Sequence, residues 1–297
     1  MRTVYLGTSQ FAAEILGILA GSPHRPELVV TRPDRPRGRG RKLAPPPVLS
    51  TARELEIPTD QPESVNDEAA RARIAAAAPD AVVVCAFGAL IKEPLLSEHQ
   101  MLNVHPSLLP RWRGAAPIER AIMAGDERTG VSIMRLTEGL DSGPVCLTAE
   151  EPIGPKETYG SLAERLAPIG GELLIRALDT SPPFHEQDES AVTYAEKITA
   201  EDRLLDPTRP AIELERVVRA LYPHVGAAIT GPGADRLGVW TAIARSPQPG
   251  DPPPGELGLD GPVPTLGCTP GTLALTTVQP AGRRQMPGEA YLRGLRS

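Results

Sequence analysis

A chain of 297 residues can form one large or two medium domains around a buried core, and its 40% hydrophobic and 23% charged residues are ordinary for a globular protein. The formal net charge of -6 argues against a protein that coats nucleic acid through a broad positive field, although it permits a local basic site. Three cysteines, far apart and odd in number, fit neither a zinc site nor a disulfide framework, which favours a reducing compartment and a cytoplasmic location.

The first part of the chain alternates short apolar runs with helical patterns. Residues 3–6 predict a strand, and apolar residues at helical spacing follow from Phe11 to Leu19. Further strands are expected at 28–30, 57–59, 81–86, 101–104, 131–136 and 145–148, and helices at 46–56, 66–78, 117–124 and 161–178. This alternation predicts an α/β fold with a Rossmann-like, doubly wound, mostly parallel sheet over roughly the first 180 residues. No apolar stretch approaches the roughly 20 residues that span a membrane, so no membrane partner is expected.

Residues 31–42 are too rich in proline, glycine and charge for regular structure, and we predict a long exposed loop. Against one aspartate, this loop carries six basic residues: Arg32, Arg35, Arg37, Arg39, Arg41 and Lys42. Arginines on such a loop can bind phosphates through forked hydrogen bonds. A solvated loop without a ligand has the same composition. In an acidic protein, however, one concentrated basic loop indicates a focused, salt-sensitive contact with a polyanion.

The last third of the chain has a different pattern. One helical pattern at 210–221 precedes short strand candidates at 225–230, 237–244, 256–259 and 273–278. Their turn-rich spacing predicts a small C-terminal β-barrel. We therefore expect a first domain over residues 1–185, a linker over 186–207 and the barrel over 208–297.

The stretch from Met101 to Pro117 is the most informative. Asn103 and His105 lie two residues apart at the end of a predicted strand, so both side chains share one face, at the edge where open α/β sheets place ligands. An imidazole can accept a proton from a nucleophile, and an amide can donate to a developing oxyanion. Asp141, in a glycine-flanked loop, could orient the imidazole. The three suit attack on a carbonyl or formyl carbon, but spacing alone does not bring Asp141 to the pair, and a structural histidine explains His105 equally well.

Other chemistries are not indicated. The turn after Leu6 holds a single glycine, so the dinucleotide fingerprint is absent and NAD is not expected. Neither histidines nor cysteines have zinc-ligand spacing, and no metal is expected. Ser107 lies close to His105 but lacks the glycines of a nucleophile elbow.

Four motifs together resemble the core of the folate-dependent formyltransferases. They are NVH from Asn103, SLLP from Ser107, RGAAP from Arg113 and GLDSG from Gly139. Three further stretches, residues 33–43, 193–198 and 278–286, resemble the branch of this superfamily that acts on initiator methionyl-tRNA. The resemblance extends from residue 3 to residue 292 and is patchier in the second domain.

This resemblance implies transfer of a formyl group from 10-formyltetrahydrofolate to the α-amino group of methionine on initiator methionyl-tRNA, for translation initiation. It implies a catalytic trio of Asn103, His105 and Asp141. Folate is expected at Phe87, Gly88, Ser107, Leu108, Leu109 and Pro110. The tRNA is expected at Arg35, Arg37, Arg39, Arg41 and Lys42, with Arg39 matching the family's tRNA-contacting arginine. The second domain is expected to be an oligonucleotide-binding-like barrel that helps to hold the tRNA, and the protein to be a monomer.

Two alternatives stay open. The same chemistry could act on a small amine, such as an amino-sugar nucleotide or glycinamide ribonucleotide, although such an acceptor would require neither the basic loop nor the C-terminal domain. An inert RNA-binding protein on the same scaffold would instead bind tRNA without forming a folate-dependent product.

Overall fold

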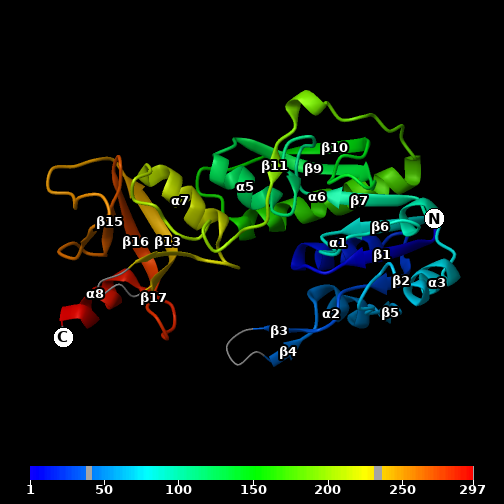
Figure 1. Ribbon diagram of the computed structural model, residues 1–297, viewed down its shortest axis with the longest axis horizontal. Helices are drawn as coiled ribbons and strands as arrows, with labels where there is room; N and C mark the ends of the chain where they lie inside the picture. Colours follow the sequence, from blue (N-terminus) through cyan, green and yellow to red (C-terminus); the bar gives the residue numbers. More distant parts are fainter. Residues whose placement is uncertain (38–41, 231–235, 297) are drawn as a thin grey trace. The chain divides into compact units, whose positions relative to one another are not determined.

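The computed structural model describes residues 1–37, 42–230 and 236–296. The chain forms two compact units: unit 1 comprises residues 1–117, 128–152 and 163–195, and unit 2 comprises residues 118–127, 153–162 and 196–297. The fold class expected from the sequence is confirmed, because a mostly parallel sheet in unit 1 is followed by an antiparallel sheet in unit 2 (Figure 1). Within the described part of the chain, no helix combines the length and the apolar character needed to cross a membrane.

Seven strands form the sheet of unit 1, in the order β10-β9-β7-β6-β1-β2-β5. They are β1 (Thr3–Gly7), β2 (Pro26–Val30), β5 (Thr59–Asp60), β6 (Ala81–Cys85), β7 (Met101–His105), β9 (Arg128–Arg135) and β10 (Val145–Pro152). Neighbours from β7 to β5 run parallel, whereas β9 runs antiparallel to both β7 and β10. Every residue of β6 is buried, as its continuous apolar run predicted for a strand covered on both faces.

Helices cover both faces of this sheet: α1 (Gln10–Ala20), α2 (Pro47–Glu54), α3 (Glu68–Ala76), α4 (Leu95–Glu98) and most of α6 (Tyr159–Thr180). On one face, Ile74 of α3 and Leu95 of α4 join an apolar cluster with alternate residues of β1 and β6. On the other face, Gly170 of α6 packs where a Cβ atom would lie 3.2 Å from Val104 of β7 and 3.3 Å from Ile15 of α1. The central strands of the sheet are therefore covered on both faces, whereas the edge strand β10 is only partly buried.

The strand order reverses between β1 and β6. The chain builds β2 and β5 on one side of β1 and then returns to place β6 and β7 on the other side. At such a point, the loops after the two central strands diverge and leave a crevice in which ligands bind. The topology thus directs a ligand to the edge where β1, β6 and β7 end.

The basic segment differs from the long loop that we expected. β3 (Arg35–Arg37) and β4 (Lys42–Ala44) pair antiparallel as a hairpin, here called the basic arm, which extends away from the sheet (Figure 1). A two-stranded ribbon needs no buried face, and each strand has an open edge that tolerates the missing N–H of Pro36. The prediction of no regular structure over residues 31–42 was therefore wrong at 35–37 and at Lys42, whereas residues 31–34 are irregular as predicted. Residues 38–41 lie outside the described residues.

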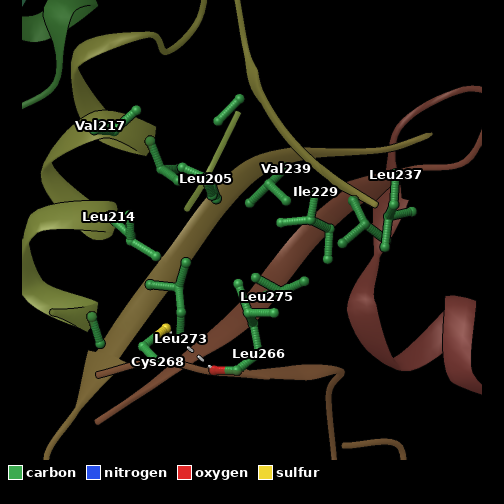
Figure 2. Packing of buried hydrophobic residues seen from close by; sticks show 14 of the residues in the cluster. Leu205, Leu214, Val217, Ile229, Leu237, Val239, Leu266, Cys268, Leu273 and Leu275 are labelled. Atoms are coloured by element: carbon green, nitrogen blue, oxygen red, sulfur yellow. Dashed lines mark hydrogen bonds between the residues drawn. The ribbon is translucent and has the colours of Figure 1, made fainter. Parts of the chain in front are cut away.

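Unit 2 contains a six-stranded antiparallel sheet. Its strands are β12 (Ala227–Thr230), β13 (Arg236–Arg245), β14 (Leu257–Gly258), β15 (Thr265–Gly267), β16 (Thr272–Gln279) and β17 (Met286–Pro287). The helix α7 (Ala211–Ala220) packs on this sheet, and Figure 2 shows its Leu214 directed toward the side chains of β16, among them Leu273. The resulting core consists of apolar side chains and the Cys268 thiol, which donates to the Leu266 carbonyl at 3.5 Å.

The sequence predicted α7, β12, β13, β14 and β16 but missed three elements. β15 and β17 are only three and two residues long, too short to show period-2 alternation. The C-terminal helix α8 (Gly288–Arg296) contains Gly288 and Gly294 and buries few apolar side chains, so its helical signal is weak. In contrast, α5 (Pro117–Ala124) has the predicted bounds, with Gly125 at φ +77° just beyond its end.

Candidate active site

The structure brings Asn103, His105 and Asp141 together at the carboxyl end of β7. Asn103 Nδ2 donates to Asp141 Oδ1 at 3.3 Å, and His105 Nδ1 lies 3.7 Å from Asp141 Oδ2. Asn103 and His105 are 7% and 4% exposed. Both side chains point to one face, as their spacing predicted. Sequence spacing alone could not predict that Asp141 lies near Asn103 and His105. The fold places the Asp141 loop beside them.

The imidazole of His105 has a defined orientation. Its Nε2 lies 2.8 Å from the Trp112 carbonyl oxygen. Because a carbonyl oxygen only accepts, Nε2 must carry a hydrogen, and Nδ1 is then the basic nitrogen of the neutral ring. Nδ1 faces Asp141, so a proton taken up there produces an imidazolium next to a carboxylate. The arrangement suits a general base whose charged form is stabilised in place.

The carboxylate of Asp141 is held by a backbone donor. Its Oδ2 accepts from the Gly114 N–H at 2.9 Å. Gly114 ends the short strand β8 (Arg113–Gly114), which pairs in parallel with β11 (Tyr194–Ala195). At Gly114 the φ angle is +123°, and a Cβ atom would lie 2.7 Å from the Ala195 carbonyl oxygen, so only glycine fits. The pairing of β8 with β11 therefore fixes the donor that positions the carboxylate.

Asn103 has capacity for a further hydrogen bond. Its Nδ2 carries two hydrogens, and within the described part of the chain only Asp141 accepts one of them. The other can be given to a substrate oxygen. A buried, preorganised amide of this kind stabilises negative charge that develops on such an oxygen.

The turn from Ser107 to Pro110 follows β7 and is held by hydrogen bonds. Ser107 is fully buried and its Oγ donates to the Arg111 carbonyl at 2.6 Å, so this hydroxyl is not free to act as a nucleophile. Ser132 Oγ donates to the Ser107 carbonyl at 2.7 Å and accepts from the Leu109 N–H at 3.1 Å. Leu108, Leu109 and Pro110 are half-buried. A cavity of about 280 Å³ adjoins the turn and is lined by Leu109, Pro110, Val145, Cys146, His185 and Gln187, among others.

The loop from Phe87 to Ile91 follows β6, the neighbour of β7 in the sheet. Phe87 is buried, whereas Gly88 is exposed with φ +72°. Side chains from three other segments hold its carbonyl oxygens: Thr8 donates to Phe87, Arg32 to Gly88 and Asn66 to Leu90. Because β6 pairs with β7 at Asn103, this preformed loop starts beside the candidate site.

The basic arm presents Arg35 and Lys42 as exposed side chains. Within the described residues, neither has an ion-pair partner, so both charges can meet an external anion. Arg37 ends β3, and the two other expected tRNA-binding residues, Arg39 and Arg41, lie outside the described residues. Arg32 has a different place from the one expected, because its guanidinium binds the Gly88 carbonyl.

The sequence reasoning missed a basic hollow in unit 2. A cavity of about 320 Å³ is lined by two arginines, Arg236 and Arg283, and by Leu237, Met286 and Tyr291, among others. Arginine, apolar and aromatic side chains in one cavity lining are residue types that bind a phosphate beside a stacked base. The adjacent arginines at 283 and 284 were the only local signal.

Thiol chemistry has little support. Burial raises the pKa of the Cys85 thiol to about 12 and that of Cys268 to about 11, so both stay protonated at neutral pH. Burial also raises the pKa of Cys146. Over the described residues, no group of three His, Cys, Asp or Glu side chains is arranged to hold a metal ion.

Two family models match the chain in succession. Residues 1–178 match formyl transferase, and residues 197–296 match formyl transferase, C-terminal domain. Among curated proteins, the methionyl-tRNA formyltransferase of Methylococcus capsulatus is 43% identical over 303 residues, covering 98% of this chain and 96% of that protein. The methionyl-tRNA formyltransferase of Halorhodospira halophila is also 43% identical, over 99% of this chain and 96% of that protein.

A solved structure shares the fold at low sequence identity. HypX from Aquifex aeolicus, in complex with tetrahydrofolic acid, is 17% identical with a TM-score of 0.68; the match covers 98% of this chain but only 47% of that protein. Both family models and the relatives that match over nearly their whole length point to the same family. The chain belongs to the formyl transferase family.

Proposed function

We propose that this protein transfers the formyl group of 10-formyltetrahydrofolate to the α-amino group of methionine on initiator methionyl-tRNA. The observation that carries the proposal is the meeting of Asn103, His105 and Asp141 at the edge where the sheet directs its ligand. The relatives named for this reaction, similar over nearly their whole length, support the choice of acceptor.

The reaction begins with attack by the neutral methionine amine on the formyl carbon. An α-amino group has a pKa of about 7.7 to 8.0, so a usable fraction is unprotonated near neutrality. As the new C–N bond forms, the formyl oxygen becomes an oxyanion. Asn103 donates its second Nδ2 hydrogen to this oxygen, in a site from which bulk water is largely excluded.

His105 then moves the proton. Its Nδ1 takes the proton that the attacking amine releases, and Asp141 stabilises the imidazolium. The bond between the formyl carbon and the folate nitrogen breaks, and His105 returns the proton to that nitrogen. One C–N bond forms and one breaks, giving formylmethionyl-tRNA and tetrahydrofolate with the imidazole again neutral.

The folate is assigned to the two loops that follow β6 and β7. These loops carry Phe87 and Gly88 on one strand end and Ser107 to Pro110 on the next, and they start from paired strands. Ser107 contributes through the shape of its turn, since its hydroxyl is already bonded to Arg111. This placement leaves the donor's formyl group next to Asn103.

The tRNA is assigned to the basic arm, through Arg35, Arg37, Arg39, Arg41 and Lys42, and to the arginine-lined cavity of unit 2. Of these residues, Arg35 and Lys42 are exposed, and neither has an ion-pair partner among the described residues. Cations of this kind bind phosphates with release of counterions, so the binding is salt-dependent. Use of an aminoacylated tRNA would place the reaction in the cytoplasm. A small-amine acceptor would leave both basic surfaces without a role.

One experiment tests donor and acceptor together. The protein is incubated with 10-formyltetrahydrofolate and methionyl-tRNA, and formylmethionine is sought after ester hydrolysis. An amino-sugar nucleotide and glycinamide ribonucleotide are tested in parallel. Formylmethionine is the expected product. A product from a small amine alone would overturn the acceptor, and tRNA binding without any folate-dependent product would overturn the activity.

A further inference from the structure

A glutamine from the segment after α6 reaches the loop that carries Asp141. Gln187 Nε2 donates to the carbonyl oxygens of Asp141, at 2.8 Å, and Gly143, at 2.7 Å. Both hydrogens of its amide nitrogen are therefore used on one loop. The two bonds span 46 and 44 residues of sequence, so they are tertiary contacts and not part of a local turn.

The amide of Gln187 is itself fixed by a buried cation. Its Oε1 accepts from Arg113 Nε at 3.0 Å, and Arg113 is 3% exposed. The same guanidinium donates to both carboxylate oxygens of Glu189, at 2.7 and 3.2 Å. The hydrogen bond from Arg113 holds the pKa of the Glu189 carboxyl below its usual range, so the pair is charged at neutral pH. Because a guanidinium only donates, Oε1 must face it and Nε2 must face the loop.

The loop needs such support. Asp141 adopts φ +45°, a left-handed conformation that is uncommon for a residue other than glycine and persists only where the surroundings hold it. Its carboxylate must at the same time stay near His105 and accept from Gly114. Arg113 precedes Gly114 in β8, so one short strand supplies the donor to the carboxylate and the anchor for Gln187. Backbone and side chain of Asp141 are thus fixed by one connected frame.

We propose that Gln187 is a positioning residue for formyl transfer, which acts through Asp141. With Arg113 it forms an amide–guanidinium clamp that holds the backbone of Asp141 and Gly143. Gln187 faces carbonyl oxygens of the loop and not the reacting atoms, so its contribution is to the geometry of the carboxylate beside His105. The role in catalysis rests on the proposed function, whereas the clamp itself is a structural claim.

The test substitutes Gln187→Met, which keeps the length of the side chain and removes both donors. A displacement near 1 Å at a catalytic group can cost about a hundredfold in rate, so we expect the single-turnover rate to fall about tenfold to a hundredfold. Dissociation constants for formyl-folate and tRNA should stay within about twofold, because both amide hydrogens of Gln187 are already bonded to carbonyl oxygens of the Asp141 loop. Gln100→Met is the matched control: Gln100 is exposed and precedes β7 at the end opposite the site.

A double-mutant cycle separates positioning from a general structural role. If Gln187 acts through Asp141, Gln187→Met should lower the rate of an Asp141→Ala protein by less than about twofold. A wild-type rate in the single variant, or an equal loss in both backgrounds, would overturn the proposal. Should Gln187→Met not fold, Gln187→Glu replaces it, since it retains an acceptor for Arg113 and lacks both donors.

Amide hydrogen exchange provides a readout that does not depend on activity. Peptides covering residues 139–143 should exchange faster in Gln187→Met than in the wild type. In Gln100→Met the exchange rate of these peptides should equal that of the wild type. Unaltered exchange would refute the clamp even if transfer is observed. If the wild type forms no formylated product with any acceptor, the proposed function fails, while the exchange result still decides the clamp.

Discussion

The carboxyl edge of the sheet in unit 1 and the core of unit 2 differ in the kind of residue that each buries. At the edge, Asn103 and His105 are buried but polar, and Ala86, Trp112 and Asp141 adopt left-handed backbone conformations. In unit 2, the buried cluster is made mostly of apolar side chains from α7 and the sheet, with Leu205, Leu221 and Cys268 from adjoining segments (Figure 2). Buried polar groups and strained residues persist where they serve function, whereas apolar burial serves stability. Substitutions in the two regions should therefore affect different quantities.

The largest effect is expected at His105. His105→Ala removes the proton acceptor, and general acid–base catalysis is worth about a hundredfold to ten-thousandfold, so single-turnover formyl transfer should fall by that factor. Binding of formyl-folate should change little, since the imidazole is bonded to Trp112 and faces Asp141. A variant that transfers within about threefold of the wild-type rate would remove the imidazole from the mechanism.

The converse effect is expected at Leu275, which is fully buried in unit 2. Leu275→Ala should lower the free energy of unfolding by about 2 to 5 kcal/mol through lost burial and a cavity. Trp240 reports on this unit in a Trp112→Phe background, because the chain has two tryptophans. Ile243→Ala, at a residue 52% exposed, should change stability by less than about 0.5 kcal/mol. Equal losses at the two sites would contradict an apolar core as the source of stability.

A smaller effect is expected on the basic arm. Arg35→Ala and Lys42→Ala should each weaken tRNA binding and reduce the slope of log affinity against log salt by about 1, without changing folate binding. Arg53→Ala, an exposed arginine of α2, serves as the control. A loss of folate binding as large as the loss of tRNA binding would show that the arm supports the fold and not the acceptor.

The smallest effect is expected on the pH dependence of stability, through an ion pair in unit 2. Arg120 donates to both carboxylate oxygens of Asp202, at 2.7 and 2.9 Å, and this holds the pKa of Asp202 below its ordinary value of 3.8. A lowered folded-state pKa stabilises the protein above 3.8, and that stability is lost as the pH falls through the folded-state value. Arg120→Met should therefore lose less stability than the wild type between about pH 6 and about pH 3. Parallel urea midpoints in both proteins would show that Asp202 is not the titrating group.

The local sequence pattern was sufficient to predict the sheet and one part of the candidate site. The apolar run of β6 and the two-residue spacing of Asn103 and His105 depend on neighbours in sequence, so strand burial and a shared face could be predicted. The approach of Asp141 and Gln187 depends on which strands pair, and no local pattern encodes that. The strands of the basic arm were not predicted for a different reason. A two-stranded ribbon needs no buried apolar side chains, so its sequence has no periodic hydrophobic pattern.

The most direct test of catalysis at this edge is the single-turnover rate of formyl transfer to methionyl-tRNA by Asn103→Ala, measured beside Gln100→Ala. Loss of one oxyanion donor typically lowers turnover about a hundredfold to a thousandfold, and we expect that loss in Asn103→Ala at an unchanged unfolding transition of unit 2. Gln100→Ala, at the other end of the strand, should match the wild type. If Asn103→Ala retains nearly the full rate, the amide does not stabilise the reacting oxygen, and the assigned site is wrong.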